Sequence, residues 1–521
     1  MTLKVVRPLD LMGRYLVANS NIKYYNNFLV GNKIQLRKEN NPSFSSWKTP
    51  QKWAQLLLNP VAHLASQFPT LALSVGDHHG DNPVYLRLES IDLEQLIRVV
   101  PIDTATDIER LIEEEHNIPF YLSDTSLPFW RLAIAPIEDD DTSFYLLFVS
   151  QHAGIDGRSV MVLLEQLVEQ LNLSPNIIDD NPDSTIGAST KILFTSDITF
   201  PSPLEERIDC SISYLTLATT IVKLVLLPTF LKKALEYKYW AGEFDNTLET
   251  PYDVQTSLLQ LMPEETSRII QAAKRRSTTV QAVIYSASVF AIRSVFMPKS
   301  EQDEAITYDT VVDIRKRILN PIPRTDFGIY TTAAPRRGIY VKDESSFWNM
   351  AQEYKEDLTE KTSSEEKIRA LVDHLGSFRL LPNKASAWEQ ITTSQTSQYQ
   401  HGRSGSISMS NIGVGWNQDA STTANSSSSE NKEALRYLVK DAILSKSPIL
   451  NNVALAMTAA TANGTMSIIT TWNKAAFGGR HRVQLYMSEL KRIILEAADD
   501  GRETYLFKDA KRTCDHEVAE A

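Results

Sequence analysis

Residues 143–159 read SFYLLFVSQHAGIDGRS, and they are the clearest guide to the architecture of this chain. The apolar run over 143–150 is almost continuous, which predicts a strand buried on both faces of a sheet. A short loop, QHAGIDG, follows. A helix is predicted from about Arg158, because apolar residues then recur at helical spacing: Val160, Leu163, Leu164, Leu167, Val168 and Leu171.

The same patterns extend in both directions from this stretch. Upstream, they predict a strand at 129–135 and a helix at 93–100. Downstream, they predict strands at 255–262, 305–313, 404–410, 453–460 and 465–472, and helices at 263–276, 280–296, 345–358, 366–374 and 482–498. Asn463-Gly464 between two of these strands is a strong hairpin signal.

Strands and helices interleave in both halves, which predicts an α/β fold with mixed α+β sheets. We expect an N-terminal subdomain over residues 1–195 and a linker with an apolar segment over 196–250. A C-terminal subdomain then covers 251–500, and a charged tail covers 501–521. Residues 420–430, ASTTANSSSSE, are of low complexity and predict a disordered loop.

The composition narrows the class of protein. Of 521 residues, 53 are Lys or Arg and 64 are Asp or Glu, so the formal net charge is −11. A negative chain without a long basic run disfavours a nucleic-acid partner. The two cysteines, Cys210 and Cys514, cannot build a disulfide framework or a cysteine-rich zinc site. The N-terminal residues lack the layout of a signal peptide, so we expect a cytoplasmic protein, and a monomer.

One segment raises the question of a membrane. Residues 210–230 read CSISYLTLATTIVKLVLLPTF, about the length of a span, although Lys223 and Pro228 interrupt it. Three alternatives stay open: a buried or groove-lining helix, an amphipathic segment at a lipid surface, or a true span. Peripheral contact with the endoplasmic reticulum or lipid droplets is therefore one of our expectations.

His152 is the strongest candidate for chemistry. It follows a buried strand and precedes a helix, a position where active sites are common, and an imidazole can serve as a general base. Asp156 is close in the chain and can equally hold the loop through hydrogen bonds. A structural role for both residues is the alternative. His78 and His79 have no third ligand at a characteristic spacing, so we predict no metal site.

The loop resembles the HxxxDG motif of the CoA-dependent acyltransferase superfamily. Further landmarks of that superfamily occur in its order, at residues 127–132 (LPFWRL), 278–282 (TTVQA) and 311–315 (VVDIR). The N-terminal stretch from Arg7 to Asn27 is similar to fungal alcohol acetyltransferases in particular. Two positions depart from related families: Gln151 stands where condensation domains have a first histidine, and residues 411–416 (NIGVGW) replace the plant-type DFGWG motif.

The resemblance implies a structure and a set of roles. It implies two subdomains that each resemble chloramphenicol acetyltransferase, with an active-site tunnel between them. His152 would be the general base, and Asp156 would pair with Arg315 across the two halves to fix the loop, supported by Gly157. Ser410 and Asn411 are the candidates for stabilising the oxyanion. The co-substrate would be acetyl-CoA or another acyl-CoA, with no cofactor bound.

The acceptor stays open at this point. The first prediction is O-acetylation of a small or hydrophobic alcohol. The alternatives are N-acetylation of a lipid-like amine, transfer of a longer or carrier-bound acyl group, and an inactive acyltransferase-like fold that works as a binding module.

Overall fold

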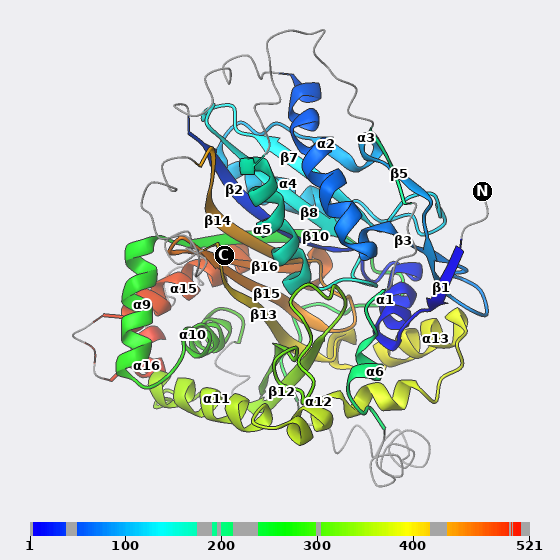
Figure 1. Cartoon of the computed structure of the whole chain (residues 1–521). Coiled ribbons are helices and arrows are strands. Elements are labelled where there is room, and N and C mark those ends of the chain that lie inside the picture. The colour runs from blue at the N-terminus through cyan, green and yellow to red at the C-terminus, as the bar shows by residue number, and fades with distance from the viewer. Residues whose placement is uncertain are drawn as a thin grey trace.

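The strand predicted at 143–150 is the middle strand of a five-stranded sheet in the computed structural model (Figure 1). The structure describes residues 4–37, 49–173, 190–194, 200–211, 238–297, 304–416, 435–499, 502 and 504–511. The strand order is β14 (Tyr437–Lys446), β2 (Phe28–Leu36), β8 (Ser143–Ser150), β7 (Trp130–Pro136) and β6 (Ile97–Val99). Every residue of β8 is buried, which confirms the prediction made from its continuous apolar run.

Helices cover both faces of this sheet. On one face, α2 (Pro50–Gln67) and α5 (Gly157–Leu173) pack through a shared core that includes Leu57, Leu163 and Leu167. On the other, α4 (Ile108–Asn117) packs through Leu111 and Ile112. The apolar stripe of α5 is buried along its length, so the predicted helix is confirmed and begins at the last residue of the motif.

The second half contains a six-stranded mixed sheet. Its order is β10 (Val254–Leu261), β16 (Thr465–Asn473), β15 (Val453–Ala462), β13 (Gly405–Gly415), β11 (Ile306–Asp313) and β12 (Thr331–Ile339), with β13 parallel to both neighbours. Four helices pack on one large core with it: α9 (Pro263–Arg275), α10 (Val280–Val295), α11 (Phe347–Lys361) and α15 (His481–Ala497). Asn463 and Gly464 have φ values of 46° and 85°, which confirms the predicted tight hairpin.

Smaller elements flank the two sheets. The strands β1 (Lys4–Pro8), β4 (Val84–Arg87) and β3 (Leu73–Gly76) form a three-stranded sheet, and β5 (Ser90–Asp92) pairs with β9 (Lys191–Leu193). The other α-helices of the described residues are α1 (Leu11–Asn21), α3 (Leu93–Leu96), α6 (Leu204–Arg207), α12 (Glu365–Phe378), α13 (Ala385–Thr396) and α16 (Phe507–Ala510).

Strand β14 crosses from one half to the other. It lies within the predicted C-terminal subdomain, yet it pairs antiparallel with β2 and completes the N-terminal sheet, which Figure 1 shows as an orange strand beside a blue one. The side-chain amide of Asn32 also donates to the carbonyl of Asp441 at 3.0 Å. The sequence contains no local signal for this exchange, because the two strands are about four hundred positions apart.

Helix α4 makes a second connection between the halves. Its Glu113 accepts a hydrogen bond from the backbone N–H of Thr256 at 3.0 Å, and its Glu109 accepts from that of Leu258 at 2.8 Å. Both donors lie on β10, the edge strand of the six-stranded sheet. These carboxylates occupy edge N–H groups that would otherwise be left open.

Two sequence predictions need comment. The helix expected over 93–100 is wrong beyond its first turn, because the chain continues after α3 as strand β6 and pairs with β7. Long-range pairing has overridden the local helical spacing. The apolar segment 210–230 lies mostly outside the described residues, and the low-complexity stretch 420–430 lies wholly outside them. No helix in the described part of the chain is long and apolar enough to cross a membrane.

Candidate active site

His152 lies in the loop between β8 and α5, where the two halves of the molecule meet. The ring of Phe28, the first residue of β2, packs on it with the ring centroids 4.5 Å apart. Its Nδ1 atom is buried and has no hydrogen-bond partner among the described residues. The residue as a whole nevertheless keeps part of its surface accessible. His152 is therefore held by packing, and no carboxylate orients it as in a catalytic triad.

The surroundings keep this imidazole neutral. The pKa of His152 is lowered to about 4, chiefly because burial disfavours the charged ring, and next because Lys446 places a positive charge nearby. Asp156 acts in the opposite direction. A neutral imidazole at pH 7 is the form that can accept a proton, so the environment suits a general base.

The backbone of the loop is held by residues of the N-terminal half. The Gln151 side chain accepts a hydrogen bond from the backbone N–H of Ala153 at 2.5 Å, and the Tyr85 hydroxyl lies 2.5 Å from the Ala153 carbonyl oxygen. Gly154 is required by space, because a Cβ there would lie 2.6 Å from the ring of Phe129. Gln151, the departure from the condensation-domain motif, thus has a structural role in this loop.

Both carboxylate oxygens of Asp156 are bonded to residues other than His152, and one of them pairs with Arg315. Its Oδ1 lies 2.9 Å from Arg315 Nη2 and also accepts from the backbone N–H and the hydroxyl of Ser159, each at 2.9 Å. Its Oδ2 accepts from the backbone N–H of Tyr330 at 3.0 Å. The contact that the resemblance implied is therefore present, and it joins the motif to the loop that follows β11.

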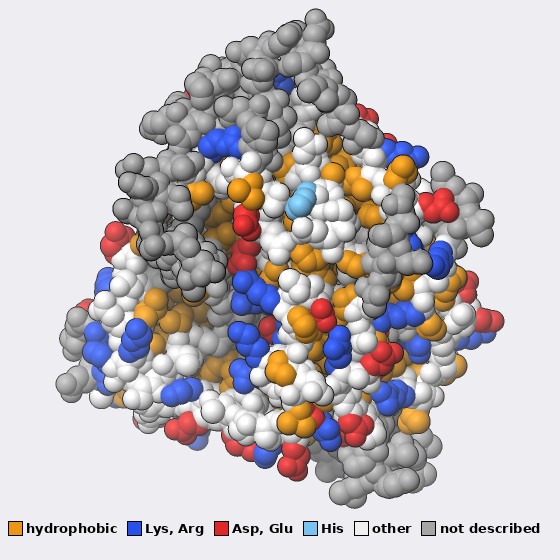
Figure 2. All heavy atoms as spheres, viewed as in Figure 1, with side chains coloured by type: hydrophobic (Ala, Val, Ile, Leu, Met, Phe, Trp, Pro, Cys, Tyr) orange, Lys and Arg blue, Asp and Glu red, His pale blue; other side chains and the backbone are white. Residues whose placement is uncertain are grey.

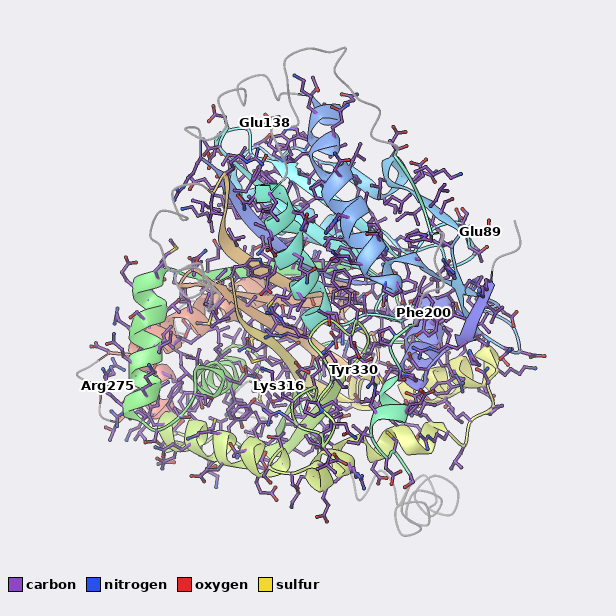
Figure 3. The ribbon with its side chains drawn as sticks, viewed as in Figure 1. Glu89, Glu138, Phe200, Arg275, Lys316 and Tyr330 are labelled. Carbon is purple, nitrogen blue, oxygen red and sulfur yellow. The ribbon has the colours of Figure 1, made fainter. Side chains whose placement is uncertain are left out.

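The charges of this pair stabilise each other. Burial by itself raises the pKa of Asp156, but the charge and hydrogen bond of Arg315, together with backbone N–H groups, bring this pKa below its usual value. The Arg315 guanidinium also lies over the ring of Tyr330, 4.9 Å from its centroid, and contacts Asp313 at 3.2 Å. Figure 3 places Tyr330 and Lys316 in the loops below the lower end of α5.

The end of strand β13 faces the first turn of α5. A Cβ on Gly157 would lie 3.2 Å from Leu444 of β14 and 3.6 Å from Ile412 of β13, so little more than glycine fits between these strands and the helix. Arg158 donates to the Ile412 carbonyl oxygen at 2.7 Å. The motif in the N-terminal half therefore contacts the strand on which the oxyanion candidates were predicted.

The two oxyanion candidates differ. The Asn411 amide donates to the side-chain oxygen of Gln281 at 2.8 Å, and its own oxygen accepts from the backbone N–H of Gly413 at 2.8 Å. Ser410 is half-buried, and its hydroxyl makes no hydrogen bond within the described residues. Asn411 is thus largely occupied, whereas the hydroxyl of Ser410 is available to a ligand.

Lys446 is the residue near His152 that the sequence did not single out. It is the last residue of β14, and burial lowers its pKa to about 8. No local pattern pointed to it, since its position depends on the pairing of β14 with β2. Among the described residues, no group of three or more His, Cys, Asp or Glu side chains could hold a metal ion.

The arrangement combines a neutral, accessible imidazole, a cation beside it, and a buried ion pair that fixes the loop. It contains no nucleophilic Ser or Cys bonded to His152 among the described residues. Such a site suits proton removal from an acceptor that then attacks an already activated acyl group.

Comparisons with known proteins agree with this chemistry. The family model described as alcohol acetyltransferase matches residues 104–493, about three quarters of the chain. Among curated proteins, none matches this chain.

Solved structures show the same fold. One is the trichothecene 15-O-acetyltransferase TRI3 from Fusarium sporotrichioides, with 14% identity, 95% of this chain and 97% of that chain covered, and a TM-score of 0.64. The condensation domain of the monacolin K polyketide synthase MokA has 8% identity, 97% and 100% coverage, and a TM-score of 0.58. Polyketide synthase associated protein 5 from Mycobacterium tuberculosis has 13% identity, 95% and 99% coverage, and a TM-score of 0.53.

Proposed function

The chain belongs to the alcohol acetyltransferase family and is an acyltransferase, and from this premise we propose that it transfers an acetyl group from acetyl-CoA to the hydroxyl of a small or hydrophobic alcohol, with His152 as the general base. The observation that carries the proposal is the state of His152. Its ring is desolvated and neutral, yet it keeps accessible surface at the meeting point of the two halves.

The residues divide the reaction between them. His152 Nε2 removes the proton of the acceptor hydroxyl as its oxygen attacks the thioester carbonyl. The resulting oxyanion needs a donor, and the hydroxyl of Ser410 is the better placed of the two predicted candidates because Asn411 is occupied by Gln281. The tetrahedral intermediate then collapses, the thiolate of CoA leaves, and it takes the proton from the imidazolium. No acyl-enzyme is required.

The surface supports a phosphate-bearing donor. The chain has a net charge of −11, yet Lys and Arg side chains gather in a column below the middle of the face in Figure 2, in the area where Figure 1 shows β13 and β12. At the motif itself, Arg158 is half-buried, and its pKa is lowered chiefly by burial and next by the charge of Arg324. Basic groups of this kind attract the phosphates of CoA.

A panel of substrates distinguishes an alcohol acceptor from the alternative acceptors and acyl donors. We expect CoA release, followed with a thiol-detecting reagent, when purified protein is given acetyl-CoA and an alcohol from a panel of increasing hydrophobicity. Parallel reactions contain amines of matched chain length, and longer acyl-CoA donors. His152→Ala is the control, because release that persists in this variant is unrelated to the site.

Each outcome has a clear meaning. Release with amines but not alcohols would replace the alcohol by an amine acceptor. Release only with longer acyl groups would replace acetyl-CoA as the donor. If no acceptor and no donor produces release that depends on His152, the proposed activity is wrong and the binding-module alternative remains.

A further inference from the structure

Lys446 and His152 lie on the same face of the five-stranded sheet. In the register of the sheet, Lys446 of β14 is opposite Phe28 of β2, and Phe28 is opposite Ser150 of β8. Residues directly opposite each other on antiparallel strands point to the same face. The Lys446 side chain therefore leaves the sheet on the face where the ring of Phe28 packs against His152.

The charge of Lys446 has no partner in the described part of the chain. No carboxylate there lies within ion-pair distance, and burial is the cause that lowers the pKa of its ammonium group. The fully buried arginines of the described residues are occupied: Arg131 by Glu115, Arg315 by Asp156, Arg403 by the carbonyl oxygens of Ala241 and Phe244, and Arg293 by that of Met297. Lys446 is half-buried, and a partly desolvated charge without a partner is costly, so its presence beside the base points to a negative charge supplied by the reaction.

We infer that Lys446 is a further catalytic residue, whose ammonium group stabilises the oxyanion formed when the acceptor attacks the acyl carbonyl. The inference rests on the proposed function. His152 takes the hydroxyl proton, the new C–O bond forms, and the carbonyl π electrons move to the oxygen beside Lys446. When that pair returns, the C–S bond breaks and the thiolate takes the proton from His152. Lys446 keeps its own protons throughout.

This role fits the rest of the site. The alcohol and the thioester are both neutral, so before the reaction nothing among them pairs with Lys446. The oxyanion appears only in the transition state and the intermediate, and an interaction gained only there lowers the barrier. Lys446 also keeps His152 unprotonated before the reaction by electrostatic repulsion. One positive charge thus serves the base and the oxyanion.

The test compares Lys446→Met, Lys446→Arg and Lys440→Met. Lys440 lies on the same strand but is exposed, which makes it the matched control. We expect Lys446→Met to lower kcat by about 10²–10³-fold with every acceptor, the usual cost of losing one oxyanion donor, while the KM for acetyl-CoA stays within about threefold. Lys446→Arg should keep a kcat within about tenfold of wild type, and Lys440→Met should not change it.

The pH profile of kcat/KM distinguishes an effect of the Lys446 charge from an effect of its packing. Removing the positive charge should move the acidic limb of the kcat/KM profile to higher pH in Lys446→Met, because His152 is then easier to protonate. Lys446→Arg should leave that limb in place. If Lys446→Met does not fold, Lys446→Arg and Lys446→Gln carry the same test, with Gln expected to lose activity.

Three outcomes would overturn the inference. The first is a kcat of Lys446→Met within about threefold of wild type. The second is a loss confined to the KM of acceptors that carry a carboxylate, which would make Lys446 a residue for acceptor recognition. The third is an unmoved acidic limb together with a lowered melting temperature, which would make it structural. If the wild-type protein shows no His152-dependent CoA release, the proposed function is wrong. If the wild-type protein and Lys446→Met are both fully active, only the inference about Lys446 is wrong.

Discussion

His152 and His116 are two histidines with lowered pKa values at opposite faces of the same sheet, and the structure treats them differently. His116 is fully buried, and both of its ring nitrogens are bonded: Nδ1 to Asn27 Oδ1 at 2.6 Å and Nε2 to Ser445 Oγ at 2.7 Å. His152 is partly accessible, and its Nδ1 has no partner among the described residues. The first ring is fixed as a structural link, whereas the second is held by packing and keeps accessible surface.

The same two chain segments build both environments. Asn27 and Ser445 hold His116, while their neighbours Phe28 and Lys446 flank His152. Successive residues of a strand point to opposite faces, so one pairing of strands sets both histidines. The comparison teaches that burial and a lowered pKa do not identify a catalytic histidine. The two rings differ in their exposure and in the hydrogen bond that His152 Nδ1 lacks among the described residues.

The largest expected effect is the loss of activity when His152 is replaced. His152→Ala should lower kcat by about 10²–10⁴-fold, the usual contribution of a general base, and leave the melting temperature near that of wild type because the buried Nδ1 has no partner among the described residues. Steady-state kinetics and calorimetry on the same preparation measure both. Activity within about threefold of wild type would remove His152 from the mechanism.

The next effect concerns the loop that carries His152. Asp156→Ala and Arg315→Ala should each cost about 3–5 kcal/mol of unfolding free energy, because each leaves a buried charge without its partner. The double variant should cost less than the sum, with a coupling of about 1 kcal/mol or more. Denaturant unfolding of all four proteins measures it. Asp313→Ala is the control, since the Asp313 side chain is 40% exposed and should contribute under about 1 kcal/mol. Strict additivity would contradict direct coupling of Asp156 and Arg315.

Replacing His116 should lower stability and leave activity intact, the reverse of replacing His152. His116→Ala should cost about 1–3 kcal/mol of stability, because Asn27 and Ser445 lose a buried partner. The kcat of the folded fraction should stay near the wild-type value. Chemical unfolding and active-site-normalised kinetics test this, with the exposed His63→Ala as control. A loss of kcat as large as that of His152→Ala would break the distinction between the two rings.

A further effect, small per pH unit, is on the pH dependence of stability. The folded-state pKa is about 4 for His152 and about 3 for His116, whereas both start from 6.5 in an unfolded chain, and burial is the main cause of both shifts. Below pH 6.5 the unfolded chain takes up protons that the folded protein does not, so stability falls as the pH falls toward 4. The slope should reach about 1.4 kcal/mol per pH unit for each histidine.

Urea unfolding at several pH values between 7 and 4 measures this slope. His116→Ala should lose the share that belongs to His116 and keep the share of His152. An unfolding free energy that does not change over this range would show that the two histidines are not desolvated in solution as they are here.

Local patterns were enough to predict much of the chain. The buried strand β8, the loop after it and the amphipathic helix α5 follow from residues that are neighbours in the sequence, and so does the hairpin at Asn463-Gly464. His152 and Asp156 were identified from the same short loop, and the family from landmarks spread along the chain. These features depend on side-chain periodicity and turn chemistry, which act over a few residues.

The composition of the site depended on contacts between distant segments. Arg315 reaches Asp156 across 159 positions, and Asn411 is occupied by Gln281 across 130. The pairing of β14 with β2 brings Lys446 to one face of the sheet and Ser445 to the other. Strand pairing over such separations is chosen by the packing of whole faces, and a ten-residue segment such as Tyr437–Lys446 carries no mark of its partner. The HxxxDG motif could therefore be recognised in the sequence, whereas the cation beside it appears only when the two halves are joined.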